Sequence, residues 1–201
     1  MSPKKAVHAA ASHLRPRVEG EREQQILDAA LEVLAEVGYD RLTMDAVAAR
    51  AKASKATLYR RWSDKGGLVI DALVALKEPV DPVPDTGSLR DDLLAVFCSP
   101  QTMLDQQVAI VGSVLTAICR DPEFASAFRE KFIAPKAAIT LKIFERAATR
   151  GELRDDLDVE LVAMALPAMV LHRMFLLGEP PSEQVVTRVV DQIVLPAATR
   201  G

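Results

Sequence analysis

Residues 42–62, LTMDAVAARAKASKATLYRRW, constrain the fold of this chain more than any other stretch. Thr43 has the side chain of a helix N-cap, and apolar residues recur at helical spacing after it. Ser54 can cap a second helix, in which Leu58 and Trp62 lie four residues apart on one face. The stretch therefore predicts two short helices joined by a tight turn, the arrangement of a helix-turn-helix.

The second of these helices is cationic on the face opposite Leu58. From Arg41 to Lys65 the chain has seven Lys or Arg and two acidic residues, a net charge of +5. Such a face can neutralise DNA phosphates and release counterions. Small side chains at the start of the helix, Ala56 and Thr57, allow close approach to a thymine methyl group. A basic, solvated helical hairpin without a nucleic-acid role is the alternative interpretation.

The motif resembles that of the TetR/AcrR family of one-component bacterial repressors. The family pattern is Thr...Ala-Gly-Val-Ser-Lys-Gly-Thr-Leu-Tyr-Arg-His-Phe, and the matching residues here are Thr43, Ala51, Ser54, Lys55, Thr57, Tyr59 and Trp62, the last as an aromatic. The chain departs from the pattern at Lys52, Ala53, Ala56, Arg61 and Trp62. Lys52 replaces a glycine in the turn, where a positive φ would favour glycine. It could instead add a phosphate contact.

The resemblance implies a division of roles along the motif. Phosphate contacts are expected from Thr43, Tyr59 and Lys65, and base contacts from Lys55, Ala56 and Thr57. The full set of expected DNA-binding residues is Thr43, Lys52, Ser54, Lys55, Ala56, Thr57, Tyr59, Arg60, Lys65, Arg15 and Arg17. The last two lie in residues 1–20, a flexible basic arm that could enter the adjacent minor groove. A disordered tail without DNA contact is the alternative.

Composition and periodicity indicate an all-α protein. Of 201 residues, 49% are hydrophobic, enough to fill a sizeable core, and no stretch alternates in the manner of a strand. The charge is asymmetric, with a net of +3 over residues 1–66 and −6 over residues 67–201. The basic end is therefore expected to meet the anion.

Glycine, proline and helix-capping residues divide the chain into segments. Residues 21–66 are predicted to form a three-helix DNA-binding domain whose first helix ends at Gly38. Residues 67–85 are expected to be a connecting helix, which begins with Ser63 as cap and Asp64 at the positive end of the helix dipole, followed by a proline-rich linker. Residues 86–201 are expected to form a helical ligand-binding and dimerisation bundle, for about nine helices in all.

Helix-start signals mark the elements of the larger bundle. Helices are predicted at 88–98, 102–119, 122–149, 158–177 and from Ser182 onwards, with caps at Ser88, Thr102 and Asp121 and a kink at Pro135. Two interpretations of the apolar residues stay open, a packed core or a cavity for a mainly apolar ligand. The candidate pocket residues are Phe97, Met103, Val111, Leu115, Phe128, Phe132, Met169 and Met174.

The last two predicted helices carry more apolar surface than one contact uses. A homodimer interface, similar to the four-helix arrangement of the family, is expected from Val162, Leu166, Val170, Val186, Val190 and Ile193. His172 and Arg173 interrupt the apolar run. They are either solvated edge residues or a polar anchor at the floor of a pocket.

The sequence lacks the residue patterns that several classes of function need. The three histidines form no catalytic or metal-ligand cluster and no glycine-rich phosphate loop occurs, so neither an enzyme nor a cofactor is expected. Cys98 and Cys119 are interpreted as buried free thiols, with a redox pair as the alternative. The N-terminus lacks a signal-peptide core, and Pro167 and His172-Arg173 interrupt the longest apolar stretch, so a cytoplasmic protein without a membrane span is expected.

The expected function is that of a dimeric regulator, most simply a repressor, that binds pseudo-palindromic double-stranded DNA. Repression and release by a small, mainly apolar effector are implied by the family resemblance alone. The alternatives are an all-α ligand-processing enzyme with an accessory DNA-binding arm, and a non-specific structural DNA binder. The second alternative would need a more basic surface than a chain with net charge −3 offers.

Overall fold

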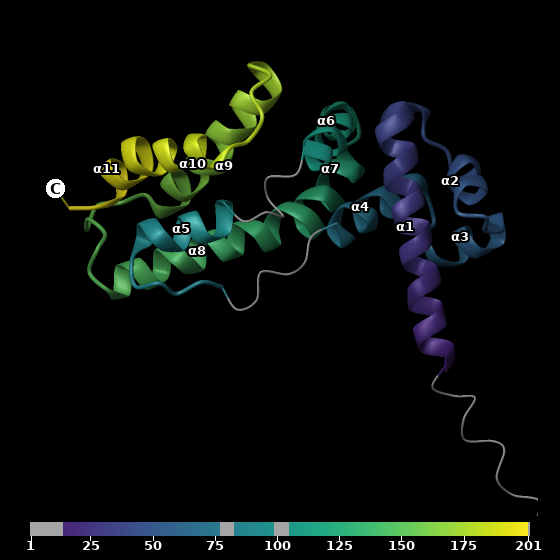
Figure 1. Ribbon diagram of the computed structural model, residues 1–201, viewed down its shortest axis with the longest axis horizontal. Coiled ribbons are helices and arrows are strands. Elements are labelled where there is room, and N and C mark those ends of the chain that lie inside the picture. The colour runs from purple at the N-terminus through teal and green to yellow at the C-terminus, as the bar shows by residue number, and fades with distance from the viewer. Residues whose placement is uncertain (1–13, 77–82, 99–104, 201) are drawn as a thin grey trace, which may run out of the picture. The chain divides into compact units, whose positions relative to one another are not determined.

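A computed structural model of the chain describes residues 14–76, 83–98 and 105–200, including their side chains except those of 14–19 and 105–109. These residues are helical with connecting turns and loops, apart from one isolated bridge between Leu153 and Thr199. Within them, the helical elements join into nine continuous helices, which confirms the predicted all-α class. The chain divides into two compact units after Leu76 (Figure 1).

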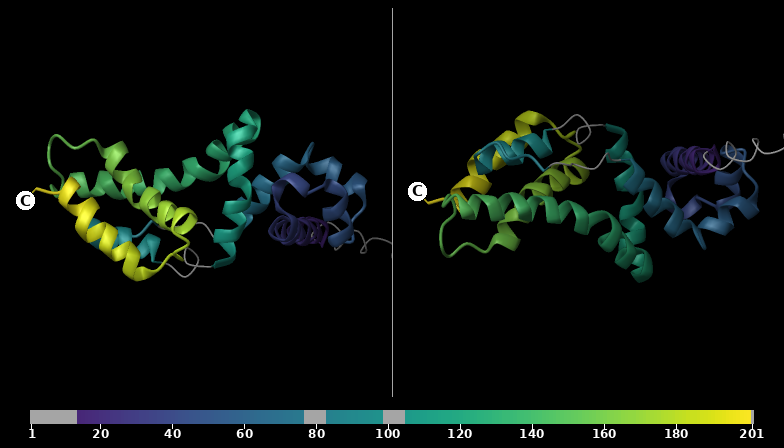
Figure 2. Two further views of the ribbon diagram at one scale, coloured as in Figure 1. Left: turned by 90° about the horizontal axis from the view of Figure 1, so that it is seen from above. Right: turned by 90° about the horizontal axis from the view of Figure 1, so that it is seen from below.

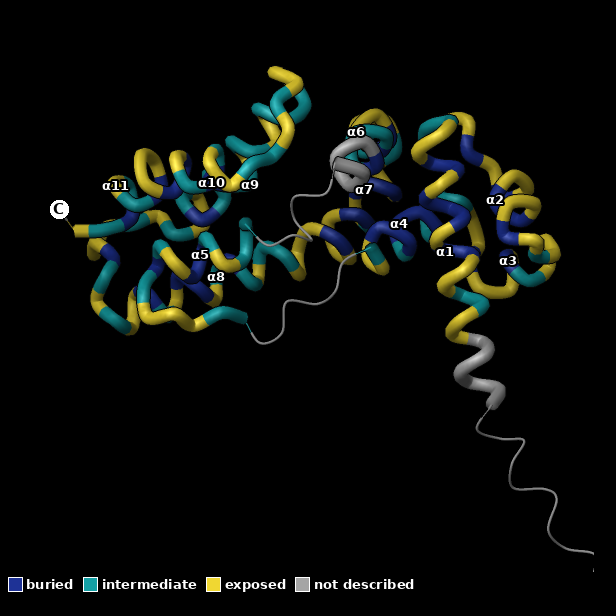
Figure 3. Tube along the Cα trace, in the orientation of Figure 1, coloured by how far each residue is buried: buried dark blue, intermediate teal, exposed yellow. Residues whose placement is uncertain are grey.

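The first unit has four helices in its described residues: α1 (Leu14–Arg41), α2 (Met44–Arg50), α3 (Lys55–Arg61) and α4 (Lys65–Ala75). Helix α1 packs against α2 and α4, and α2 packs against α3. Each of them contributes fully buried side chains, among which are Leu34, Val47, Leu58, Leu68 and Leu73. Figure 3 shows that the outer faces of α2 and α3 are exposed while their inner faces are buried.

Helix α1 extends beyond its predicted bounds of 21–38. It begins at Leu14, so the last seven residues of the expected flexible arm are helical, and residues 1–13 lie outside the described residues. Gly38 has φ 75° and ψ 167°, which breaks the helix at the predicted position because glycine has no Cβ to oppose a positive φ. A short helical turn then continues to Arg41 and brings Tyr39 into a buried position.

Helix α4 is capped by Asp64 and not by Ser63 as predicted. The Asp64 carboxylate accepts the Gly67 N–H at 2.9 Å, and the Ser63 hydroxyl donates to its other oxygen. The Gly67 hydrogen bond lowers the pKa of Asp64. A carboxylate at the positive end of the helix dipole is the stronger partner here. Because α4 packs against α1, it belongs to the first unit. Residues 77–82 of the predicted linker lie outside the described residues.

The second unit contains the remaining elements. They are α5 (Leu89–Phe97), α6 (Asp105–Arg120), α7 (Pro122–Phe128), the π-helical η1 (Arg129–Ile133), α8 (Ala134–Thr149), α9 (Val159–Leu176), α10 (Glu183–Val189), the π-helical η2 (Val190–Val194) and α11 (Leu195–Ala198). Two predicted caps are confirmed, because Ser88 accepts the Asp91 N–H at 3.1 Å and Asp121 accepts the Phe124 N–H at 3.0 Å. The predicted cap Thr102 lies outside the described residues.

The two π-helical segments share a cause. Each ends two residues before a proline, η1 before Pro135 and η2 before Pro196. A proline ring clashes with the carbonyl four residues earlier and donates no hydrogen bond to it. Widening the preceding turn to π geometry gives the ring room without ending the helix. The kink predicted at Pro135 is therefore a π segment within one continuous helix.

The core of the second unit lies between α5, α8, α9 and the helix formed by α10, η2 and α11, which lie side by side in both views of Figure 2. Its buried residues are Leu89, Leu93, Ile143, Phe144, Ala147, Leu153, Ala163, Leu166, Val186, Val189, Val190, Val194 and Ala198. Three residues predicted for the dimer interface, Leu166, Val186 and Val190, belong to this core. The placement of these three at an interface is corrected, because they are covered within one chain.

Helix α9 meets the length and composition of a membrane span, contrary to the sequence prediction. It has 18 residues with a mean hydropathy of 1.6, and 11% of them are buried. Neither Pro167 nor His172-Arg173 interrupts the helix. Helix α9 also packs against α8, α10 and η2, and a core helix of a globular unit has the same composition.

A buried carboxylate ties the start of α5 to the end of α8. Asp92 is fully buried, and its Oδ1 accepts hydrogen bonds from the Thr86 N–H at 2.6 Å and the Thr86 hydroxyl at 2.7 Å. Its Oδ2 accepts a hydrogen bond from Arg150 at 3.2 Å, and Arg150 also pairs with Glu152. Burial alone would raise the pKa of Asp92, but the donors from Thr86 and Arg150 outweigh it and lower that pKa.

Asp92→Asn should destabilise the fold by roughly 2 kcal/mol at pH 7, because a charged acceptor is lost. A carboxylate with a lowered folded pKa stabilises the fold above its unfolded pKa of about 3.9 and loses this contribution as the pH falls through the folded value. The difference in unfolding free energy between wild type and variant, measured by urea unfolding, should therefore be smaller at about pH 3 than at pH 7. Asp156→Asn, at an exposed position, is the control. A gap that is constant with pH would contradict this account.

Candidate nucleic-acid interface

The helix-turn-helix is built by two capped helices of seven residues each. The Thr43 hydroxyl accepts the Ala46 N–H at 3.2 Å at the start of α2, and the Ser54 hydroxyl accepts the Thr57 N–H at 3.1 Å at the start of α3. Trp62, directly after α3, is buried and donates its indole N–H to Asp71 of α4 at 2.9 Å. The inner face of α3 is thus fixed to the unit, which leaves its outer face for a partner.

Helix α3 carries five of the eleven residues predicted to contact DNA. Lys55, Ala56 and Arg60 are exposed, and Tyr59 is 54% exposed, which is high for an aromatic side chain. Thr57 is half-buried, and its hydroxyl lies 2.8 Å from that of Ser54. Because this pair occupies the hydroxyl groups, the methyl group of Thr57 is the part left for a base edge.

Several cations of this surface are paired with carboxylates of the same unit. The pairs are Arg50 with Glu32 at 3.1 Å and with Glu36 at 2.5 Å, Lys55 with Asp45 at 2.7 Å, and Arg61 with Glu23 at 2.7 Å. The hydrogen bond that the Lys55 ammonium donates to Asp45 raises the pKa of Lys55. Exposed pairs of this kind contribute little to stability, so a phosphate can replace the carboxylate.

Lys65 does not lie where the sequence suggested. Its ammonium donates to the backbone carbonyls of Tyr39 at 2.9 Å, Asp40 at 3.3 Å and Leu42 at 3.4 Å. It also lies 4.5 Å from the centre of the Tyr39 ring. The prediction of a phosphate contact is corrected, because the ammonium group joins the start of α4 to the end of α1. Among the described cations from Arg41 to Lys65, Lys52 and Arg60 are exposed and have neither a carboxylate nor a carbonyl partner for their side chains.

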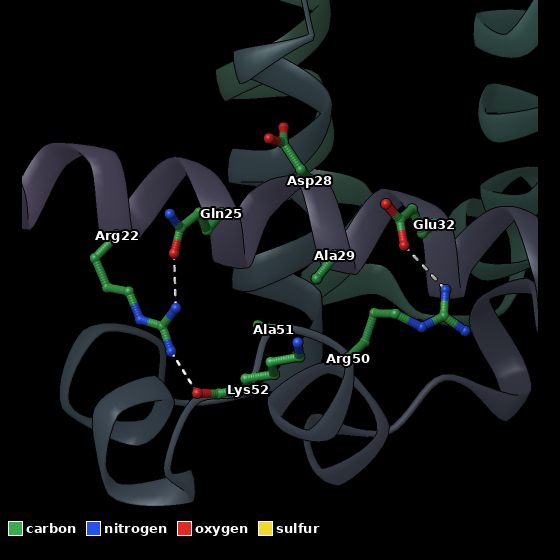
Figure 4. A pocket seen from close by; sticks show the side chains of 8 residues that line it. All are labelled: Arg22, Gln25, Asp28, Ala29, Glu32, Arg50, Ala51 and Lys52. Atoms are coloured by element: carbon green, nitrogen blue, oxygen red, sulfur yellow. Dashed lines mark hydrogen bonds and ion pairs between the residues drawn. The ribbon is translucent and has the colours of Figure 1, made fainter.

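The turn between α2 and α3 contains a strained residue. Lys52 has φ 51°, the left-handed conformation that the sequence associated with glycine. Its backbone carbonyl accepts a hydrogen bond of 2.6 Å from Arg22 of α1 (Figure 4). Sequence reasoning missed Arg22, because no local pattern links residues 30 positions apart. It also missed Asp45 as the partner of Lys55. The predicted contacts Arg15 and Arg17 lie in α1, but their side chains are outside the described part.

The candidate effector residues of the second unit do not form one group. Phe128 and Phe132 are buried and stacked on each other, with ring centres 4.8 Å apart, and Lys136 lies over the Phe132 ring. Phe97 and Met169 pack against the core. Leu115 is 39% exposed, which corrects its predicted place inside a cavity. The remaining candidates are Val111 and Met174, which are half-buried, and Met103, which lies outside the described residues.

Helices α6 and α9 approach closely at Gly112. A Cβ at this position would lie 2.9 Å from the Phe175 ring, so a larger residue here would displace that ring. Nearby on α9, His172 is exposed, and Arg173 pairs with Glu179 while its Nε is buried without a partner. His172 therefore fits the solvated-edge interpretation better than that of a pocket anchor.

Metal and thiol chemistry find little support in the described residues. No cluster of three or more His, Cys, Asp or Glu side chains occurs there in a position to hold a metal ion. Both cysteines are free. Cys98 is half-buried, and burial, followed by Glu183, raises the pKa of its thiol. Cys119 is exposed, which corrects the expectation that both thiols are buried.

Family models match both units. Residues 26–72 match the model for bacterial regulatory proteins of the tetR family, and residues 83–193 match the model for the tetracyclin repressor-like C-terminal domain. The chain belongs to the TetR family. The first match spans the capped helices and the exposed face of α3, and the second spans most of the described helices of the second unit.

Individual relatives agree with the TetR-family assignment. The DNA-binding transcriptional repressor TetR of Mycobacteroides abscessus is 37% identical, with 87% of this chain and 92% of the relative covered. The crystal structure of the TetR-family regulator SCO0332 superposes with a TM-score of 0.65 at 30% identity, covering 87% of this chain and 97% of that one. The FadR regulator of Bacillus subtilis, solved with stearoyl-CoA, shares the fold at 18% identity and a TM-score of 0.65, covering 85% and 96%.

These findings define the class of this TetR-family protein. It is a DNA-binding transcriptional regulator of the repressor type, and it is not an enzyme. The helix-turn-helix prediction from residues 42–62 is thereby confirmed at the level of the family.

Arg60→Ala should weaken binding to all DNA sequences alike and reduce the slope of log affinity against log salt by about 0.9, the value for one phosphate contact. Lys65→Ala should leave this slope unchanged and instead lower the unfolding temperature, because its ammonium supports three carbonyls. Fluorescence anisotropy at several salt concentrations and thermal unfolding measure the two effects. A reduced salt slope in Lys65→Ala would restore the original phosphate prediction.

Proposed function

We propose that this repressor is a homodimer that binds a pseudo-palindromic operator through one α3 helix from each protomer and leaves it when a small, mainly apolar effector binds. In this proposal residues 21–66 recognise DNA, residues 67–85 connect, and residues 86–201 hold the effector and the partner protomer. The protein acts in the cytoplasm, where its DNA is. The observation that carries the proposal is the exposed start of α3, with Lys55, Ala56 and the Thr57 methyl group together.

Base recognition is supported by the chemistry of that surface. The N-terminal residues of a recognition helix approach base edges in the major groove. Ala56 and Thr57 are small enough to let the helix approach, and an apolar methyl group suits the methyl group of thymine. Lys55 can leave Asp45 for a guanine edge or a phosphate, since both partners are exposed. Tyr59 and Arg60, further along the helix, face the DNA backbone.

Selection from a library of random duplexes tests this assignment. The wild type should enrich a two-fold symmetric site whose half-sites are about one helical turn or more apart. Thr57→Ser keeps the hydroxyl pair and the cap but removes the methyl group, so it should change the preferred base at one position of each half-site. It should weaken binding to the wild-type site about fourfold, the value of one buried methyl group. Arg60→Ala, the matched control, should keep the same preferred site.

If the wild type enriches no site, sequence-specific recognition is excluded. If Thr57→Ser keeps every base preference, α3 reads DNA through other residues.

Dimerisation is supported by apolar side chains that one chain leaves exposed on α9. Leu161, Ala168, Leu171 and Leu176 recur at spacings of seven, three and five residues, and each is exposed. Ile193 of η2 is exposed as well. This set replaces the buried Leu166, Val186 and Val190 in the proposed interface, while the half-buried Val162 and Val170 remain candidates at its edge. Exposed leucines of this number on one helix are typical of a surface that a partner covers.

Leu171→Glu should convert the dimer to monomers, because an unpaired carboxylate would be buried at the interface. Val74→Glu, on α4, is the matched control: both side chains are 42% exposed in the single chain, and both changes add one charge. Light scattering at micromolar concentration should find monomers for Leu171→Glu and dimers for the control, with native circular dichroism in both. A monomeric wild type would remove this part of the proposal.

Effector binding is supported by the match of residues 83–193 to the tetracyclin repressor-like C-terminal domain and by the fold shared with an acyl-CoA-bound regulator. A hundredfold loss of operator affinity corresponds to about 2.7 kcal/mol of coupling, a usual value for allosteric proteins. The coupling is reciprocal, so operator DNA weakens effector binding by the same factor. Motion of α4 relative to the bundle is the simplest route for this coupling.

A further inference from the structure

The turn of the helix-turn-helix depends on one residue in a conformation that its side chain opposes. Among the described residues, Lys52 alone combines a positive φ with a side chain other than that of glycine. The left-handed region brings Cβ close to the backbone, so an L-residue is strained there. The position of α3 relative to α2 depends on this residue, because the chain reverses between the two helices at this point.

Hydrogen bonds of the turn require the strained conformation. The Lys52 N–H donates to the Ala49 carbonyl at 3.1 Å, and the Ala53 N–H donates to the Ala48 carbonyl at 2.8 Å. These two bonds form a Schellman motif, which closes a helix only when the residue after its C-cap is left-handed. If Lys52 relaxed to a negative φ, both bonds would be lost and the start of α3 would move.

Arg22 binds the carbonyl of the peptide between Lys52 and Ala53, the peptide whose N–H bonds to Ala48. Its guanidinium donates to the Lys52 carbonyl at 2.6 Å, and Gln25, on the same side of α1, accepts from the guanidinium at 2.7 Å and orients it. A hydrogen bond from a charged donor is stronger than one between neutral groups. Both contacts are drawn in Figure 4.

The surroundings leave this contact with a specific role. Arg22 and Lys52 line a hollow of about 300 Å³ between α1 and the turn. On the α2 side of the hollow, Arg50 bonds to Glu32 and so ties the end of α2, not the turn, to α1. Among the described contacts, the bond from Arg22 is the side-chain hydrogen bond that links α1 to the backbone of the turn.

We propose that Arg22 is a positioning residue for DNA recognition, which holds Lys52 in the left-handed conformation and thereby sets the orientation of α3. In this chain the bond from α1 replaces the conformational freedom that a glycine would supply. The proposal rests on the proposed recognition of DNA by α3. It assigns to Arg22 no contact with phosphate.

A set of variants separates this role from others. Arg22→Met removes the guanidinium but keeps much of the side-chain length. This change is made in three backgrounds: the wild type, Lys52→Ala and Lys52→Gly. Lys52→Ala lacks the ammonium group but keeps the backbone strain, and Lys52→Gly lacks both. Arg41→Met, which removes an exposed arginine of the same helix bonded to the Val37 carbonyl, is the control for charge.

The probe is the duplex enriched by the wild type from random DNA, titrated at several salt concentrations. Arg22→Met should weaken binding about tenfold in the wild-type and Lys52→Ala backgrounds, the effect of one charged hydrogen bond. It should weaken binding less than about twofold in Lys52→Gly, because glycine adopts the turn without help. The slope of log affinity against log salt should be the same with and without Arg22. The control Arg41→Met should change neither the sequence preference nor the conformation of the turn.

Amide hydrogen exchange at Ala53, followed by NMR without DNA, tests independently of DNA binding whether Arg22 stabilises the turn. Exchange should be faster in Arg22→Met and return to the wild-type rate when Lys52→Gly is added. Unchanged exchange in Arg22→Met, or an equal loss of affinity in the Ala and Gly backgrounds, would overturn the proposal. A salt slope lower by about one unit would do the same, since Arg22 would then bind a phosphate. If the wild type enriches no duplex, the proposal that α3 recognises DNA is rejected. The exchange rates still show whether Arg22 stabilises the turn.

Discussion

Neither α2 nor α3 can exist as an isolated helix, and the DNA-binding surface depends on what holds them. Each has seven residues, and helices of fewer than about twelve residues are marginal in water because nucleation is unfavourable. In each, a capping hydroxyl group accepts one N–H of the first turn, and buried Leu58 and Trp62 fix α3 to the rest of the unit. The ammonium group of Lys65 joins the ends of α1 and α4 beside them. The position of the surface is therefore set by its contacts with the longer helices α1 and α4.

Features that depend on neighbours in sequence were predictable. An N-cap and the N–H that it accepts are three residues apart, so the starts of α2, α3, α5 and α7 followed from Thr43, Ser54, Ser88 and Asp121. The break at Gly38 followed from its freedom to adopt a positive φ. The family resemblance added the role of α3, which charge and periodicity alone left open between a DNA reader and a solvated hairpin.

Features that depend on distant partners were not predictable. The charge of Lys65 suits a phosphate as well as a carbonyl, and only the position of the end of α1 decides between them. Similarly, an apolar residue on a helix that is apolar all round can face its own core or a second protomer. Val190 is fully buried in its own unit, whereas Ile193, three residues later, is exposed. The choice of Ser63 as the cap of α4 failed because the carboxylate of Asp64 accepts the Gly67 N–H, and the Ser63 hydroxyl donates to that carboxylate instead.

The π-helical segments allow the second unit to tolerate a change in chain length. In each, one residue more than an α-helix needs is accommodated in a single turn. Because that turn absorbs the extra residue, deleting one residue within 129–133 would restore regular α geometry while the rest of α8 keeps the same face toward the core. Ile143 and Phe144 of α8 would then stay buried. The loss would fall instead on Pro135, whose ring would again clash with the carbonyl four residues earlier.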